Sequence, residues 1–173
     1  MERKSLKRFK KLEELFYNNL KERLLKDDFL MAKLPELEEA IQNTRKAYIE
    51  TGSFAFCAKC AKEGEKCCGL GIEWKVTPSE FIINLLLYEK HNKTVAYNLE
   101  KKDECLFLGE NGCTLFMPPI LCRNFFCEKL REFLGENKLK FIQNAMEKEA
   151  NLSFILCDYL NKHYLQNLYK EEE

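Results

Sequence analysis

Apolar residues in the first third of the chain recur at intervals of three and four positions, which predicts amphipathic helices. Asp27 and Asp28 interrupt this pattern, and Pro35 is expected to open a second helix at its first turn. Gly52 is expected to end that helix, because glycine readily takes the left-handed conformation of a helix C-cap. The apolar stripe of the first helix consists of Leu6, Phe9, Leu12, Phe16, Leu20 and Leu24.

The pattern becomes irregular after the second helix. Segment 57–71 is rich in glycine and cysteine and is expected to be a loop. Apolar and polar residues alternate over 72–76, which predicts a short strand. Thr77 and Glu80 then form the sequence signature of a capping box, with proline at the first helical position. The helix that follows is expected to run to about His91.

The second half of the chain predicts one hairpin and two further helices. Segment 105–116 is expected to turn at Asn111-Gly112. Segment 122–127 leads into a helix that is expected to end at Gly135, and the acidic tail 171–173 is expected to be disordered. The last long helix carries Leu139, Ile142, Met146, Leu152, Leu156 and Leu160.

Together these elements predict a mainly α protein, with helices around a small cysteine-rich metal-binding hub and one short β-hairpin. The length of 173 residues suits a single domain. Within it we expect N-terminal helices over 1–52, the cysteine hub over 53–130 and C-terminal helices over 131–173.

Charge and hydropathy limit the expected binding partners and the expected cellular location. Lys plus Arg and Asp plus Glu both number 28, so no overall field favours nucleic acid or an acidic membrane. A basic run from Arg3 to Lys11 is expected to be a solvated helix face. The charged N-terminus has no apolar segment behind it, and no run is long enough to span a bilayer. We therefore expect a cytoplasmic protein that binds neither nucleic acid nor a membrane, and the question of an unknown protein partner stays open.

Cysteine is the unusual component of the composition. Eight of the nine cysteines lie between positions 57 and 127. Disulfides rarely persist in the reducing cytosol, where clustered cysteines are more often metal ligands. The Cys57-x-x-Cys60 spacing lets two thiolates from one tight turn meet one metal centre. The predicted metal ligands are Cys57, Cys60, Cys67, Cys68, Cys105, Cys113, Cys122 and Cys127.

The cysteine motifs resemble those of a known family. They are Cys57-x-x-Cys60, Cys67-Cys68, Cys105-Leu-Phe-Leu with Gly112-Cys113, and Pro119-x-x-Cys122-Arg123. In order and character they are similar to the zinc- or iron-chelating cysteine-cluster family, the YkgJ-type proteins. The resemblance covers positions 57–127. Pro118 stands where that family usually has an arginine.

The resemblance implies a zinc or iron centre. A related cysteine cluster occurs in flagellin lysine methylases, which implies that iron–sulfur chemistry is available to such a hub. The chain has no recognisable S-adenosylmethionine-binding signature, so methylase activity is not implied. No phosphate loop, Gly-x-Ser-x-Gly or metalloprotease motif is present either, and whether the protein is an enzyme stays open.

Eight thiols could fill two four-ligand sites, or one site with spare thiols. In a regular hairpin, Cys105 and Cys113 would be about 13 Å apart along the strands, so they share a metal only if the backbone curls. A three-residue turn that pairs position 109 with 113 would bring both to one face, and it requires positive φ at Gly112. Cys122 and Cys127 can share a site only if Cys122 precedes the helix.

Three functions remain. The first is an iron–sulfur protein, with a [4Fe–4S] cluster serving electron transfer or sensing. The second is a structural zinc module that mediates protein interactions, and the third is a thiol–disulfide enzyme using Cys57 and Cys60. Cys157 is expected to be a core residue, and His91 and His163 are expected to be structural rather than ligands. The adjacent Cys67-Cys68 pair suits a simple zinc knuckle poorly and favours iron–sulfur.

Overall fold

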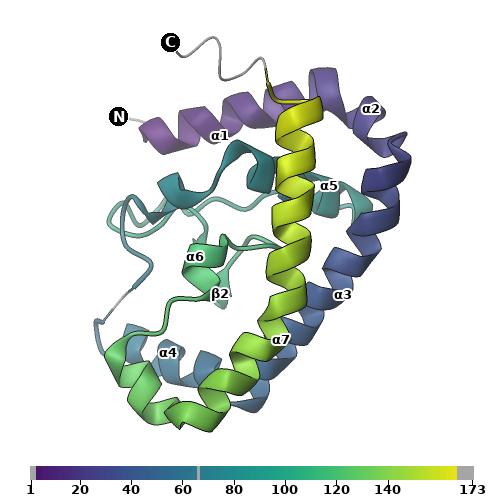
Figure 1. Cartoon of the computed structure of the whole chain (residues 1–173). Coiled ribbons are helices and arrows are strands. Elements are labelled where there is room, and N and C mark those ends of the chain that lie inside the picture. Colours follow the sequence, from purple (N-terminus) through teal and green to yellow (C-terminus); the bar gives the residue numbers. More distant parts are fainter. Residues whose placement is uncertain (1–2, 66, 167–173) are drawn as a thin grey trace.

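The computed structural model describes residues 3–65 and 67–166. The two longest helices, α3 and α7, lie side by side, while α1 crosses one end of the pair and α4 lies at the other (Figure 1). The chain is mainly helical, as the pattern predicts. The described helices are α1 (Lys4–Leu15), η1 (Phe16–Leu20), α2 (Lys21–Leu25), α3 (Asp28–Glu50), α4 (Ser53–Lys62), η2 (Ile72–Lys75), α5 (Pro78–Lys90), α6 (Ile120–Arg123) and α7 (Glu128–His163).

The N-terminal helices bear out most of the pattern. All six residues of the predicted apolar stripe are buried, although a π-helical turn, η1, separates α1 from α2. The predicted start of the second helix at Pro35 is wrong, because Pro35 lies inside α3. Asp27 is the N-cap instead: its carboxylate accepts a hydrogen bond from the backbone N–H of Leu30 at 3.0 Å. Gly52 follows the helix end with φ +78°, as predicted.

Two predictions for the cysteine-rich region are wrong. Cys57 and Cys60 lie on the helix α4 rather than in a loop. The expected strand over 72–76 is the 3₁₀-helix η2, entered from Gly71 at φ +92°. The apolar alternation there does not match burial, since Trp74 is exposed and Glu73 is buried. The capping box of Thr77 and Glu80 at the start of α5 is present as predicted.

The hairpin and the last helix agree with the pattern in outline. The strands β1 (Leu108–Gly109) and β2 (Gly112–Cys113) pair antiparallel. The backbone of Gly135 is non-helical, with φ +66°, so α7 changes direction there. Gly135 therefore separates two helical stretches of α7, and the predicted helix end there is confirmed. The tail 171–173 lies outside the described residues. In the part of the chain that is described, no helix is long and apolar enough to cross a membrane.

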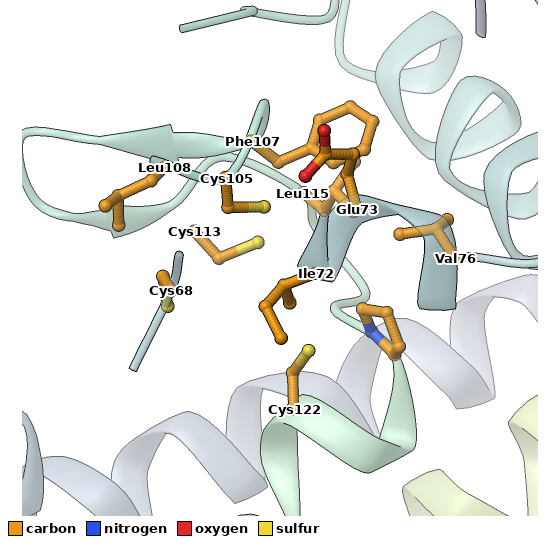
Figure 2. Close-up of a pocket in the computed structure, with 11 residues that line it drawn as sticks. Cys68, Ile72, Glu73, Val76, Cys105, Phe107, Leu108, Cys113, Leu115 and Cys122 are labelled. Carbon is orange, nitrogen blue, oxygen red and sulfur yellow. The ribbon is translucent and has the colours of Figure 1, made fainter. Parts of the chain in front are cut away.

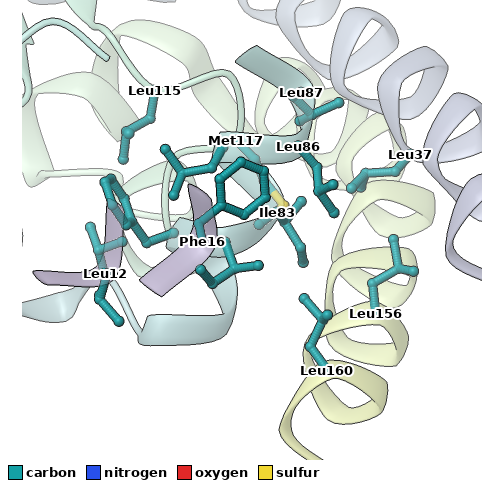
Figure 3. Packing of buried hydrophobic residues seen from close by; sticks show 14 of the residues in the cluster. Leu12, Phe16, Leu37, Ile83, Leu86, Leu87, Leu115, Met117, Leu156 and Leu160 are labelled. Carbon is teal, nitrogen blue, oxygen red and sulfur yellow. The ribbon is translucent and has the colours of Figure 1, made fainter. Parts of the chain in front are cut away.

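One large apolar core joins the helices to the hub. Figure 3 shows side chains of α1, α5 and α7 meeting Leu115 and Met117, which come from the segment after the hairpin. Leu115 and Met117 are fully buried. The hub segment is thus held by the same core that stabilises the helices. A smaller cluster, made by Ala47, Leu130, Leu134 and Ile142, lies where α3 meets the first part of α7.

The hub segment between Cys113 and Cys122 is hydrogen bonded to helix side chains. The fully buried Asn84 on α5 donates to the carbonyl of Met117 and accepts from its N–H, both at 2.9 Å. Tyr88 donates its hydroxyl to the carbonyl of Thr114 at 2.5 Å. Arg45 on α3 donates to the carbonyl of Leu115 at 3.3 Å. These bonds satisfy backbone groups that no strand or helix satisfies.

The basic N-terminal run is not a simple solvated face. Arg3 donates to the carbonyl of Glu104 at 2.8 Å and also contacts the carbonyl of Lys101. Arg8 donates to the carbonyl of Val76 at 3.1 Å, and its guanidinium lies over the Trp74 ring. α1 therefore fixes the loops of the hub as well as the core.

Asn84→Ala should destabilise the protein strongly. The change leaves the N–H and the carbonyl of Met117 buried without their partner, at about 1–3 kcal/mol for each group. Urea unfolding monitored by circular dichroism measures the effect. Asn144→Ala, at an exposed position on α7, is the matched control and should change stability by about 0.5 kcal/mol or less. Equal unfolding free energies for the two variants would contradict this anchoring role.

Candidate metal centre

Four cysteines from separate segments line one cavity. They are Cys68, Cys105, Cys113 and Cys122, here called the inner cysteines. Figure 2 shows their side chains surrounding the cavity, with Ile72 and the hairpin closing its sides. The cavity has a volume of about 40 Å³. Apart from the thiols and one carboxylate, its lining is apolar: Ile72, Val76, Phe107, Leu108, Leu115 and Pro119.

Cys68 and Cys105 are brought together by backbone pairing. Gly69 and Glu104 form an antiparallel bridge. On one side of it, the N–H of Cys105 donates to the carbonyl of Cys68 at 2.9 Å, and on the other the N–H of Leu70 donates to the carbonyl of Asp103 at 3.0 Å. Residues opposite each other in such a pairing have neighbouring side chains. The bridge therefore fixes two thiols at the same edge of the cavity.

The hairpin has a different register from the predicted one. Leu108 pairs with Cys113 and Gly109 with Gly112, so the loop has two residues and not three. The predicted positive φ at Gly112 is confirmed at +103°. Glycine at both ends of the loop permits the tighter turn, since a Cβ at Gly109 would lie 2.9 Å from the Thr114 side chain.

Cys105 and Cys113 nevertheless face the same cavity, for a reason other than the predicted one. Alternation along a strand would place them on opposite faces in this register. Cys105 lies outside the strand, however, and its carbonyl accepts a hydrogen bond from the N–H of Leu108 at 3.1 Å in a tight turn. The backbone curls between Cys105 and β1, so strand alternation does not apply. Cys113 is exposed as a residue, but its thiol points inward (Figure 2).

Cys122 reaches the cavity from the short helix α6. Pro119 is the N-cap of this helix and keeps the preceding chain extended. The neighbouring Arg123 is buried against Glu149 of α7, and the two side chains are in direct contact. The hydroxyl of Tyr48 on α3 donates to the carbonyl of Arg123. Two long helices therefore hold α6, and with it the Cys122 thiol, in place.

Burial disfavours charge on the inner thiols. It raises the pKa of Cys105 to about 11 and that of Cys113 to about 12. The pKa of Cys68 and of Cys122 is also raised, first by burial. After burial, backbone N–H groups of Phe107 and Leu115 lower the pKa of Cys105 and Cys113 in part, while neighbouring thiolates raise the pKa of all four inner cysteines. Four thiolates in this cavity require a compensating cation.

Two buried carboxylates lie beside the cavity, and neither was predicted. Glu73 is part of the lining; it accepts hydrogen bonds from the hydroxyl of Ser5 at 2.8 Å and the N–H of Gly71 at 3.0 Å. Glu104 is buried and accepts a hydrogen bond from the side-chain amide of Asn98 at 3.1 Å. No periodic pattern marks such residues, because their burial depends on loop packing.

The other four predicted ligands, Cys57, Cys60, Cys67 and Cys127, do not line this cavity. They are called the outer cysteines below. Cys157 lies on α7 against the main core, as expected. Within residues 3–65 and 67–166, no three Cys, His, Asp or Glu side chains lie close enough together to hold a single metal ion.

The two histidines are also separate from the cavity. His91 stacks on Phe116, with ring centroids 5.2 Å apart, and contacts the carboxylate of Glu38. His163 lies against Tyr159, with centroids 4.3 Å apart. Both contacts agree with the expectation that the histidines are structural.

Comparison with known proteins adds no relative: no family model, curated protein or solved structure matches the chain.

Gly112→Ala should destabilise the hub. At φ +103° a side chain is strained even though the space beside Gly112 is open, and the expected loss is about 1–2 kcal/mol. Thermal unfolding measures it. Gly69→Ala is the matched control, because it also faces open space but lacks positive φ. The same melting temperature in both variants would argue against the tight two-residue turn.

Removing one partner of the buried Arg123–Glu149 pair should be costly. Burial lowers the pKa of Arg123 and raises that of Glu149, so each charge depends on the other. Glu149→Ala is expected to lose about 3–5 kcal/mol of stability in urea unfolding.

Replacing both members, with Arg123→Met and Glu149→Leu, should restore much of that loss, since no unpaired charge is then left buried. The exposed pair Lys140–Glu136 provides the control, and Glu136→Ala should cost less than about 1 kcal/mol. A double variant as unstable as Glu149→Ala would mean that packing, and not charge pairing, dominates.

Proposed function

We propose that the chain holds an iron–sulfur cluster at the inner cysteines and uses it in electron transfer or sensing. The observation that carries the proposal is that Cys68, Cys105, Cys113 and Cys122, drawn from three separate segments, line one cavity. Four thiolates are the ligand set of a [4Fe–4S] cluster.

The surroundings of the four thiols support a metal centre. The lining is otherwise apolar, and both oxygens of its one carboxylate, Glu73, already accept hydrogen bonds. Thiolates are therefore the donors left for a ligand, and they favour soft cations over calcium or magnesium. An apolar shell also limits solvent access and so tunes the potential of a bound centre.

Four thiolates can hold either a four-iron cluster or a single zinc ion. The cavity volume of about 40 Å³ favours the second candidate, a structural zinc ion, because that space suits one ion without expansion. Metal analysis separates the two candidates.

An electron-transfer or sensing role is supported by the position of the cavity. Cys113 is exposed as a residue while its thiol faces the cavity (Figure 2), so little protein would separate a centre here from a docked electron-transfer partner. The thiol–disulfide alternative is less well supported. Its nucleophile would need a lowered pKa, whereas burial raises the pKa of Cys57 to about 11.

The proposal predicts bound metal that depends on the inner cysteines. Protein purified without oxygen should contain iron and sulfide in stoichiometric amounts and absorb in the visible range. In the Cys105→Ser/Cys113→Ser variant, the iron and sulfide of one centre should be lost. Elemental analysis and absorption spectra measure both. Loss of the centre should also lower the melting temperature, since binding energy contributes to folding energy.

Cys157→Ser is the matched control, because this thiol lies on α7 away from the cavity and should not affect metal content. Stoichiometric zinc without iron would replace the first candidate by the second. Less than one metal centre per chain in the wild type, or no change in the inner variant, would refute a centre at this cavity.

A further inference from the structure

The outer cysteines lie on three elements that meet at the other end of the hub. Cys57 and Cys60 are three positions apart on α4, so they share one face of this helix. Cys127 is the N-cap of α7. Cys67 precedes the bridge that places Cys68 in the inner cavity. Whether these four thiols also form a group is decided by the contacts between their elements.

Aromatic packing holds α4 against the start of α7. The rings of Phe56 and Phe133 stack with centroids 4.6 Å apart. Phe56 and Cys127 pack against the same small apolar cluster. Since Phe56 immediately precedes Cys57, this contact places the cysteine-bearing helix beside the N-terminus of α7, as Figure 1 also shows.

An ion pair brings the segment after α4 to the same place. The N–H of Glu65 donates to the carbonyl of Cys60 at 3.0 Å. The Glu65 carboxylate in turn binds the ammonium of Lys129, with N–O distances of 2.5 and 2.6 Å. Glu65 is two residues before Cys67, and Lys129 is two residues after Cys127. The contact therefore places Glu65, which is near Cys67, beside the first turn of α7, which is near Cys127.

The electrostatic influence of the thiols on one another agrees with this geometry. The pKa of Cys57 is raised first by burial and then by Cys127, Cys67 and Cys60, in that order, with Cys68 last. The pKa of Cys67 is raised by burial and then by Cys127 and Cys60. Each outer thiol with a raised pKa is thus close to other outer thiols, and Cys67 also raises the pKa of its sequence neighbour Cys68.

We propose that Cys57, Cys60, Cys67 and Cys127 form a second four-thiolate site for a thiophilic metal centre, separate from the inner cavity. The consecutive residues Cys67 and Cys68 then belong to different sites. Of this dipeptide only Cys68 lines the inner cavity, because its carbonyl is bound by the N–H of Cys105. The division uses all eight clustered cysteines and leaves Cys157 outside.

Thiol protection tests the second site independently of the first. Reduced full-length protein is loaded without oxygen, in one arm with Fe²⁺ and sulfide and in the other with Zn²⁺ alone. Each sample is then alkylated, and mass spectrometry of its peptides reports which thiols reacted. In the wild type all eight clustered cysteines should be protected. Cys157 should be alkylated to the same extent with and without metal. The loading condition that protects the thiols, either Fe²⁺ with sulfide or Zn²⁺ alone, identifies the kind of centre.

Paired variants show whether the sites are separate. In Cys57→Ser/Cys60→Ser, Cys67 and Cys127 should become reactive while the inner cysteines stay protected. In Cys105→Ser/Cys113→Ser the pattern should reverse, with Cys68 and Cys122 reactive and the outer four protected. Metal bound per chain should fall by half in each variant, with the helical circular dichroism signal retained.

Different failures identify different errors. Reactive outer thiols in loaded wild type would overturn the second site and leave the proposed centre at the inner cavity intact. Reactive inner thiols with protected outer thiols would do the reverse. Loss of protection at every cysteine in both variants would indicate one shared centre and overturn the division. If a variant does not fold, two wild-type measurements decide between one site and two. They are the protection pattern and the number of metal centres per chain, which should be two.

Discussion

Backbone hydrogen bonding is the constraint on which the cysteine hub depends. The segments that carry the inner cysteines have two residue pairs of regular sheet and one short helix, yet parts of them are fully buried. A buried backbone group without a partner is unfavourable, so helix side chains supply the partners. Asn84, Tyr88 and Arg45 do this for the segment that joins the hairpin to α6. The cavity is shaped by the helices as well as by its own loops.

In this arrangement the scaffold folds around thiols that carry no charge. The apolar core and the hydrogen bonds bring the inner cysteines together while burial keeps their pKa values high. A metal centre would replace the thiol protons, and its binding energy would add to the stability of a hub that the helices already position. Such a hub differs from a small zinc finger, whose fold depends on its metal.

The sequence predicted features set by local chemistry and missed those set by packing. The apolar stripe of α1, the capping box at Thr77 and the positive φ at Gly112 each depend on a few neighbouring residues. Pro35 inside α3 was missed because the capping aspartate lies eight positions earlier. The hairpin register also escaped prediction, since two and three residues both fit a loop with glycine near its end.

Of the candidate site, the sequence predicted the eight cysteines but not how they divide. Spacing alone suggests that Cys57 with Cys60, or Cys67 with Cys68, act as pairs. Of the adjacent pair, only Cys68 lines the inner cavity, where the bridge at Gly69 places it beside Cys105. That bridge joins residues 35 positions apart in the chain, so no local pattern reveals it. Which thiols line the cavity is therefore a tertiary property, and adjacency in sequence is a poor guide to it.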